Sequence, residues 1–235
     1  MKILITGTSR GLGYSLAKKY LHEGVEVIGI STTTPPNDLT QQLNYFHFPV
    51  NLMDRGELHK ALSSLNILPD RVILNAGAAF DDNTDKFSRE EFQKNFSLNL
   101  DANMDIVSFF LPRFLENKKG TFAAVSSLSV IQEINPVRVG YSASKSALDI
   151  TFQNLGISYR KSGINFVVFR AGRMEEKGGL LSEGYEDAAS RIIKSLENNK
   201  NNSYVEEFPL LLASITRLVS ILPQPLLNIL FSKKI

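Results

Sequence analysis

A tyrosine and a lysine stand four residues apart near the start of a predicted helix. Behind Tyr141 and Lys145, the apolar residues Leu148, Phe152 and Leu155 step by four and three positions. Side chains at this spacing share one helix face, so the phenol and the ammonium leave the helix on the same side. A nearby cation favours phenolate and lowers the phenol pKa from about 10 toward neutral pH. The pair therefore predicts proton transfer, although a lone Tyr-x-x-x-Lys pair is common on helix surfaces.

A glycine-rich loop supplies the second motif. It follows a strand expected over 3–6 and opens a helix expected over 12–22. Glycine permits a tight turn and a close approach of the backbone to a pyrophosphate, and the helix N-terminus offers free N–H groups. A strand-to-helix turn without a ligand would also favour glycine, so the Tyr–Lys pair is what favours a dinucleotide. The predicted cofactor loop is Gly7, Thr8, Ser9, Arg10, Gly11, Leu12 and Gly13.

Short apolar runs alternate with amphipathic stretches along the chain. This alternation predicts βαβ units and a Rossmann-type, doubly wound parallel sheet of about seven strands in a three-layer α/β/α domain over 1–207. Gly24 is expected to end the first helix, and Ser88 with Glu91 to form a capping box. Strands are expected at 3–6, 25–30, 44–48, 72–74, 121–126, 165–169 and 203–207, and helices at 12–22, 54–65, 88–116, 140–161 and 185–198.

Composition excludes several classes of function. The net charge of +2 is too small for a nucleic-acid footprint. The chain has no cysteine and three histidines, which excludes disulfides and thiolate ligands and disfavours a metal site. No secretory leader is visible, so a cytoplasmic location is expected.

The end of the second predicted strand indicates which cofactor is bound. A carboxylate there would accept from the ribose 2′-hydroxyl of NAD(H), whereas this chain has Ser31, Thr32 and Thr33, with Arg10 in the glycine loop. Hydroxyls and a guanidinium can bind a 2′-phosphate, which favours NADP(H) and leaves NAD(H) as the alternative. An ordinary polar turn with a solvated arginine is the interpretation without a ligand.

Further polar residues fall where strands or helix stripes would direct them to a site. Ser126 and Ser127 end the fifth strand, at the carboxyl edge where open α/β sheets bind ligands. Asn99 lies on an apolar helix stripe, where it would kink the helix, hold a water or be a satisfied structural amide. The turn Asn75-Ala76-Gly77 after the fourth strand is expected close to the cofactor.

Together these motifs resemble the short-chain dehydrogenase/reductase family, of the compact single-domain type, over about residues 1–207. The resemblance implies that Tyr141 is the general acid or base and that Lys145 binds the nicotinamide ribose and lowers the Tyr141 pKa. It implies that Ser127 orients a carbonyl and that Asn99 holds a water in a proton relay. It also adds cofactor contacts at Asn51, Leu52, Ala171, Gly172 and Met174.

Some positions depart from the family pattern. Asn51-Leu52 replaces an Asp-containing pair, Ala171-Gly172 replaces Pro-Gly, and Glu176 stands where a threonine is frequent. Ser127 lies fourteen residues before Tyr141, one more than usual, which leaves either a loop insertion or Ser126 as the active serine.

The resulting hypothesis is an NADPH-dependent reductase of ketones or aldehydes. Its substrate is a small molecule, and one form of the hypothesis makes that molecule lipidic. The alternative is a catalytically silent NADP(H)-binding sensor or scaffold. The resemblance implies a homodimer or homotetramer. The apolar segment 208–235 has three interpretations: packing on the core, packing in a subunit interface, or contact with a membrane surface aided by Lys233 and Lys234.

Overall fold

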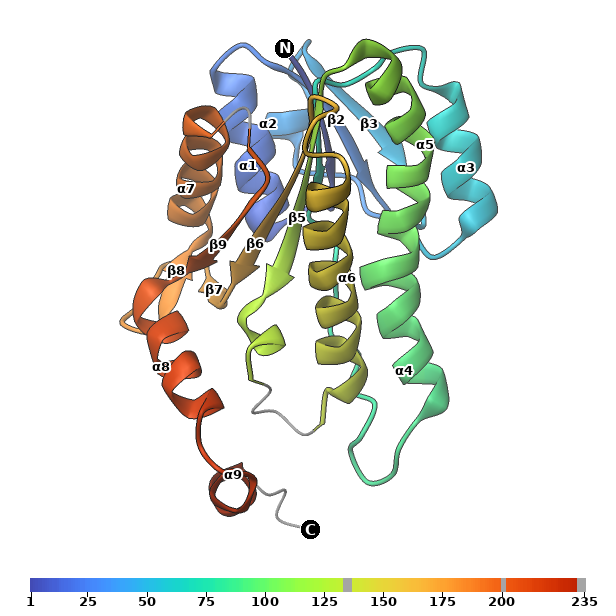
Figure 1. Cartoon of the computed structure of the whole chain (residues 1–235). Coiled ribbons are helices and arrows are strands. Elements are labelled where there is room, and N and C mark those ends of the chain that lie inside the picture. Colours follow the sequence, from blue (N-terminus) through green and yellow to red (C-terminus); the bar gives the residue numbers. More distant parts are fainter. Residues whose placement is uncertain (133–136, 200–201, 232–235) are drawn as a thin grey trace.

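Seven parallel strands form the central sheet of this protein, seen in a computed structural model that describes residues 1–132, 137–199 and 202–231 (Figure 1). Their order is β3-β2-β1-β4-β5-β6-β9. Starting from β1, the chain adds β2 and β3 toward one edge of the sheet and the later strands toward the other edge. This confirms the predicted doubly wound sheet. The strands are β1 (Lys2–Thr6), β2 (Glu26–Ser31), β3 (Tyr45–Pro49), β4 (Arg71–Leu74), β5 (Gly120–Ser127), β6 (Ile164–Ala171) and β9 (Tyr204–Phe208).

Alternate side chains of these strands enter two separate cores. On β1, Ile3 and Ile5 pack with one set of helices, whereas Leu4 packs with the other. Both faces of the sheet are thus covered, which explains why the inner strands are mostly apolar rather than alternating with polar residues. One face carries α1 (Gly11–His22) and α7 (Tyr185–Asn198), and the other carries α3 (Arg55–Ser64), α5 (Ala102–Asn117) and α6 (Val139–Ser158).

The helix predicted over 88–116 is helical throughout, but one of its turns is not α-helical. It consists of α4 (Arg89–Phe96), one π-helical turn over Ser97–Asp101, and α5. The capping box is half formed: Ser88 Oγ accepts from the Glu91 N–H at 3.2 Å, while the Glu91 carboxylate binds Lys94. The Ser88 N–H donates instead to the Asp82 carbonyl at 2.7 Å, because the preceding loop folds back onto the helix start. At the end of α1, Gly24 adopts a φ of 75°, as expected for a helix stop.

Five elements were not expected from the sequence. They are α2 (Asn37–Thr40), the two-stranded pair β7 (Arg173–Glu175) and β8 (Ser182–Gly184), and two C-terminal helices, α8 (Leu210–Ser220) and α9 (Gln224–Phe231). In Figure 1, α8 and α9 lie beyond the carboxyl ends of the central strands. Residues 232–235 of the predicted C-terminal segment, with Lys233 and Lys234, fall outside the described residues.

A chain of ion pairs fastens α8 to the sheet. Arg170 of β6 binds Asp149 of α6 through two nitrogens at 2.8 Å and Glu207 of β9 at 2.9 Å. Arg217 of α8 binds the same Glu207 at 2.7 and 2.9 Å. Asp149 is fully buried, so its charge is compensated by Arg170 rather than by water, whereas the Arg217 side chain is 60% exposed.

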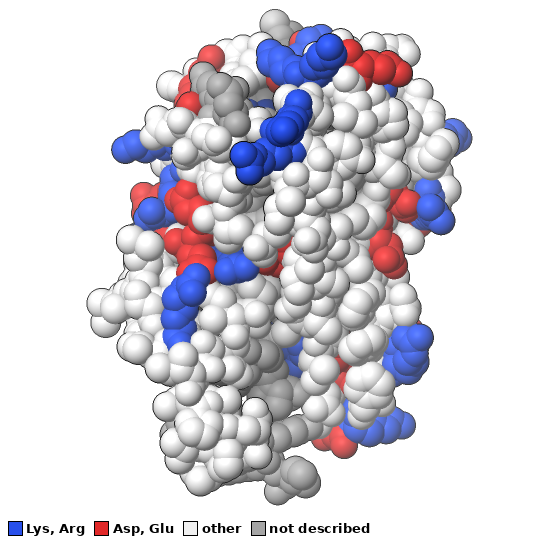
Figure 2. Space-filling view, viewed as in Figure 1, with Lys and Arg blue, Asp and Glu red and all other residues white. Residues whose placement is uncertain are grey.

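The outer side of α8 and α9 is apolar and exposed. Leu218 is 65% and Ile221 77% exposed, while Ala213 and Leu227 face the body of the protein. Figure 2 shows few charged side chains over these two helices. Among the described residues, no helix combines the length and the hydropathy needed to cross a membrane.

Candidate active site

The glycine loop between β1 and α1 is built by close backbone packing. Gly7 and Gly11 have φ values of 76° and 58°, in the left-handed region that favours glycine. A Cβ on Gly13 would collide with the Gly7 carbonyl oxygen and lie 2.5 Å from Asn75 Nδ2. Asn75 Nδ2 donates to the Thr6 carbonyl at 3.0 Å, so the turn after β4 holds the glycine loop in place. The exposed backbone at the start of α1 can therefore approach a pyrophosphate.

This loop forms one side of a cleft of about 830 Å³ along the carboxyl edge of the sheet. Most predicted cofactor residues line it, together with the Tyr–Lys pair. The lining residues among the predicted ones are Gly7, Ser9, Arg10, Gly11, Leu12, Ser31, Thr32, Asn51, Leu52, Asn75, Ala76, Gly77, Tyr141, Lys145, Ala171, Gly172 and Met174.

Four predicted residues lie beside the cleft rather than on its surface. Thr8 is buried and shares a 2.8 Å hydrogen bond with the Tyr45 hydroxyl. Gly13 packs beneath the loop, and Asn99 lies beneath Gly77. Ser127 Oγ accepts from the Ser129 N–H at 3.1 Å.

The Tyr–Lys pair lies in the first two turns of α6. Lys145 is only 4% exposed, and its Nζ donates to the Val125 carbonyl of β5 at 2.7 Å. Burial lowers the pKa of Lys145 to about 8. Its Nζ would stand 2.9 Å from a Cβ on Gly77, so the ammonium reaches the turn after β4 as well. The cleft thus brings the phenol and the ammonium to one place, as their spacing predicts.

Asn99 is fully buried in the π-helical turn. Its Oδ1 accepts from the Ala78 N–H at 3.1 Å, and its Nδ2 donates to the Ala78 carbonyl at 3.0 Å and to Ser144 Oγ at 3.1 Å. The helix interruption and the satisfied amide were both among the alternatives. Asn99 therefore joins the π-helical turn to α6 and to the loop after β4.

The two serines at the end of β5 differ in environment. Ser126 lines the cleft, and its Oγ donates to the Lys145 carbonyl at 3.4 Å. Ser127 caps the short helical turn Leu128–Val130.

At the other end of the cleft, Arg10 and the hydroxyl-bearing turn after β2 face the same space. Ser31 Oγ donates to the Thr33 carbonyl at 2.9 Å and bonds His47 Nε2 at 3.0 Å. Thr32 Oγ1 donates to the Val50 carbonyl at 3.3 Å. Arg10, Thr32 and Thr33 are exposed, whereas Ser31 is buried, and all four line the cleft.

Two of the lining residues that the sequence analysis missed carry polar side chains. Tyr185, at the start of α7, lies 3.4 Å from where a Cβ on Gly11 would be and covers the glycine loop. Arg138 precedes α6, lines the cleft and pairs with Asp81 at 2.8 Å. No local sequence signal indicates either residue, because each reaches the cleft through the packing of distant segments.

The comparisons with known proteins agree with this geometry. Residues 1–177 match the short chain dehydrogenase family. A 3-oxoacyl-[acyl-carrier-protein] reductase of Buchnera aphidicola is 28% identical over 179 residues, covering 72% of this chain and 71% of the relative. An uncharacterized oxidoreductase of Myxococcus xanthus is 27% identical and aligns with 96% of this chain and 94% of its own.

Solved structures show the same fold. The crystal structure of serine dehydrogenase from Escherichia coli superposes with a TM-score of 0.76 at 19% identity, covering 88% of this chain and 97% of that one. An oxidoreductase from Burkholderia thailandensis gives a TM-score of 0.77 at 18% identity, covering 93% and 95%. The protein therefore belongs to the short-chain dehydrogenase family and is an NAD(P)-dependent oxidoreductase.

Proposed function

We propose that this protein reduces a ketone or aldehyde to an alcohol with NADPH, and that Tyr141 is the general acid. The observation that carries the proposal is the buried Lys145 ammonium, held beside Tyr141 at the cleft that the glycine loop borders. The glycine loop has no room for added Cβ atoms, and the N-terminus of α1 offers backbone N–H groups. Both features suit a dinucleotide pyrophosphate. When bound, the cofactor supplies a hydride to the carbonyl carbon.

The protein residues would supply the proton and the orientation. The Tyr141 hydroxyl would donate its proton to the carbonyl oxygen as that oxygen gains negative charge. Lys145 would stabilise the phenolate that remains, and its ammonium would bind the ribose hydroxyls. A hydroxyl of Ser126 or Ser127 would orient the carbonyl, and Asn99 would support Lys145 through a water.

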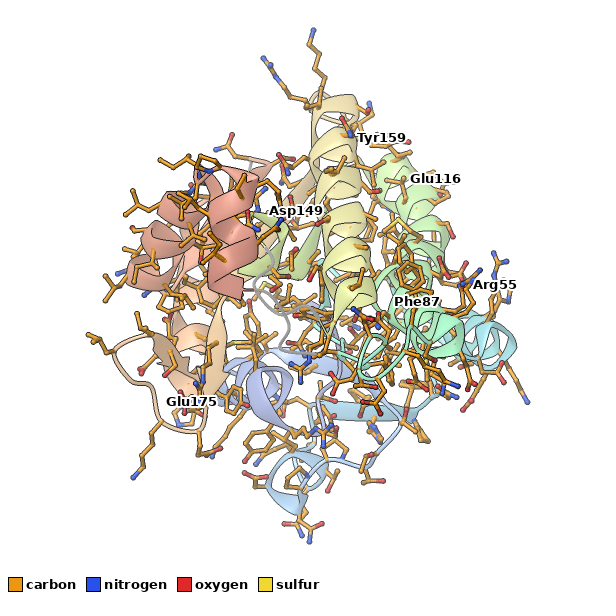
Figure 3. The ribbon with its side chains drawn as sticks, turned by 90° about the horizontal axis from the view of Figure 1, so that it is seen from below. Arg55, Phe87, Glu116, Asp149, Tyr159 and Glu175 are labelled. Atoms are coloured by element: carbon orange, nitrogen blue, oxygen red, sulfur yellow. The ribbon has the colours of Figure 1, made fainter. Side chains whose placement is uncertain are left out.

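The test measures NADPH consumption against a panel of carbonyl compounds. Tyr141→Phe should lower kcat by about 10²–10⁴, the usual contribution of a general acid, with NADPH affinity nearly unchanged. Tyr159→Phe is the matched control, because Tyr159 lies at the far end of the same helix (Figure 3). Turnover by Tyr141→Phe at the parental rate would refute the assigned acid. Tight NADPH binding without turnover on the whole panel would favour a silent sensor or scaffold.

The cofactor preference is part of the proposal. Arg10 and the Ser31–Thr33 turn support NADP(H), because no carboxylate of this turn repels a 2′-phosphate. The solved relatives include a serine dehydrogenase complexed with NADP+ and a 4-hydroxyisoleucine dehydrogenase complexed with NADH. Affinities for NADPH and NADH, measured on the same protein, decide between them.

We further propose that α8 and α9 contact a lipid surface and that the substrate is lipidic. The exposed apolar side of these helices supports this, as does their position next to the cleft. A Cβ on Gly172 would lie 2.7 Å from Leu212 Cδ2, so α8 packs directly against a lining residue. A subunit interface of a homodimer or homotetramer is the alternative use of the same side.

A further inference from the structure

The carboxylate of Asp82 caps the N-terminus of α6, the helix that carries Tyr141. Asp82 is fully buried in the loop between β4 and α4. Its Oδ1 accepts from the Val139 N–H at 2.9 Å, and its Oδ2 accepts from the Gly140 N–H at 2.5 Å. These are the two residues that immediately precede Tyr141.

Helix α6 has no side-chain cap from its own sequence. Its N-cap residue, Arg138, makes no capping hydrogen bond. The first N–H groups of a helix have no partner within the helix, and their partial positive charge favours an anion. Asp82, 57 residues away in the chain, therefore supplies both the acceptors and the charge.

A buried amide holds this carboxylate in place. Asn95 Nδ2 donates to Asp82 Oδ2 at 3.2 Å and to the Phe80 carbonyl at 2.9 Å, while Asn95 Oδ1 accepts from the Phe80 N–H at 3.1 Å. A backbone hydrogen bond also joins the two segments, since the Asp82 N–H donates to the Val137 carbonyl at 3.0 Å. We call Asp82, with its hydrogen bonds to the start of α6, the Asp82 clamp. A Cβ on Gly140 would collide with Asp82 Oδ2, so glycine is required where the carboxylate approaches.

We propose that Asp82, oriented by Asn95, is a positioning residue that fixes the first turn of α6 and thereby aims the Tyr141 phenol into the cleft. This inference rests on the proposed role of Tyr141. Lys145 lies one turn further along and is held separately by the Val125 carbonyl. The Asp82 clamp therefore controls the phenol more than the ammonium or the glycine loop.

The principal test is Asp82→Asn, which keeps the size of the side chain but turns an NH₂ toward N–H donors. We expect kcat to fall about 10- to 100-fold, with the Kd for NADPH changed less than twofold. The solvent deuterium isotope effect on kcat should rise, because a displaced phenol makes proton donation slower. Asp85→Asn, which removes a charge from an exposed position of the same loop, should match the parent.

Two readouts do not depend on turnover and separate this inference from the proposed reaction. Amide hydrogen exchange at Val139 and Gly140 should accelerate in Asp82→Asn, and the ring NMR signals of labelled Tyr141 should change position or broaden, because the first turn of α6 no longer holds the ring in one place. If the parent reduces no carbonyl but both changes occur, the proposed function fails and the positioning role stands. Faster exchange with unchanged Tyr141 ring signals and parental kcat would overturn the positioning role.

Gly140→Ala provides the same test by a second route, should Asp82→Asn fail to fold. Its added methyl group displaces the carboxylate while all polar groups remain. We expect the same loss of kcat with NADPH affinity retained, and no further loss in the double variant, because both changes break one contact. Equal losses of kcat and NADPH affinity, accompanied by a lower Tm, would reduce Asp82 to a purely structural role.

Discussion

The Nζ of Lys145 donates a 2.7 Å hydrogen bond to the carbonyl of Val125, so a buried ammonium is tied to β5, a central strand of the sheet. This bond directs the charge into the cleft rather than toward solvent. Burial of that charge also has a measurable thermodynamic consequence.

The free energy of unfolding should rise with pH between about 8 and 10.5 because of Lys145. Burial lowers its pKa from 10.5 to about 8, so within this window the unfolded chain binds more protons than the folded one. Below pH 8 both states are protonated and the cost of the buried charge, on the order of 3 kcal/mol, is fully present. Lys145→Met should therefore be more stable than the parent at pH 7.

Urea unfolding of the cofactor-free proteins checks this prediction. The advantage of Lys145→Met should shrink steadily as the pH rises from 8 to 10.5. Lys161→Met, at an exposed position just beyond α6, should show no such trend. A constant difference between parent and Lys145→Met over the whole range would contradict the lowered pKa.

Gly13→Ala should remove cofactor binding and lower stability. The added methyl group would collide with the Gly7 carbonyl oxygen and Asn75 Nδ2, both of which belong to the cofactor loop or its support. Such overpacking costs typically about 1–3 kcal/mol. Thermal unfolding and NADPH titration measure both effects. Gly56→Ala is the control, because its methyl group would meet only Asp54 Oδ1, at 3.4 Å, and it should leave both quantities nearly unchanged.

Arg10→Ala should weaken NADPH binding at least tenfold and leave NADH binding unchanged. A charge-assisted hydrogen bond to a phosphate is worth about 1.5–3 kcal/mol, and NADH lacks the 2′-phosphate. Fluorescence titration with both cofactors gives the two affinities. Arg89→Ala, on exposed α4, should not change either one. Equal weakening of both cofactors would place Arg10 at the pyrophosphate instead.

Leu218→Glu combined with Ile221→Glu should abolish binding to anionic phospholipid vesicles without lowering Tm, because both side chains are exposed. Ser214→Glu with Asn228→Glu adds the same charge at polar exposed positions and should retain more of the binding. Vesicle co-sedimentation and the mass in solution are the measurements. If the parent does not bind vesicles and the double variant at Leu218 and Ile221 dissociates to smaller species, the apolar side of α8 is a subunit interface.

The order and type of the main elements could be predicted because βαβ folds carry strong local signals. Apolar strands, glycine turns and the Tyr–Lys spacing are all visible within a few residues. The π-helical turn at Ser97–Asp101 could not be located, although Asn99 on an apolar stripe indicated an irregularity. Its partners, Ala78 and Ser144, lie 21 and 45 residues away.

The C-terminal helices escaped prediction for a different reason. Residues 208–231 are rich in apolar residues, so the segment was interpreted as a single apolar extension, and Pro223 and Pro225 obscure the start of α9. Asp82 and Tyr185 were equally invisible, because their importance arises from where distant loops bring them. The sequence thus indicates the reacting groups more readily than the residues that aim them.

The carboxylate of Glu207, which two arginines share, helps to fix the position of α8 relative to the sheet. Arg170 of β6 and Arg217 of α8 both bind it, so movement of α8 away from the sheet would leave Arg217 without this partner, while Arg170 would keep Glu207 and Asp149. Leu212 of α8 lies against Gly172 of the cleft, so a lipid surface under α8, as proposed, would lie close to that part of the cleft. Anchoring and access would then be a single event, with material passing between that support and the reacting groups without crossing open solvent.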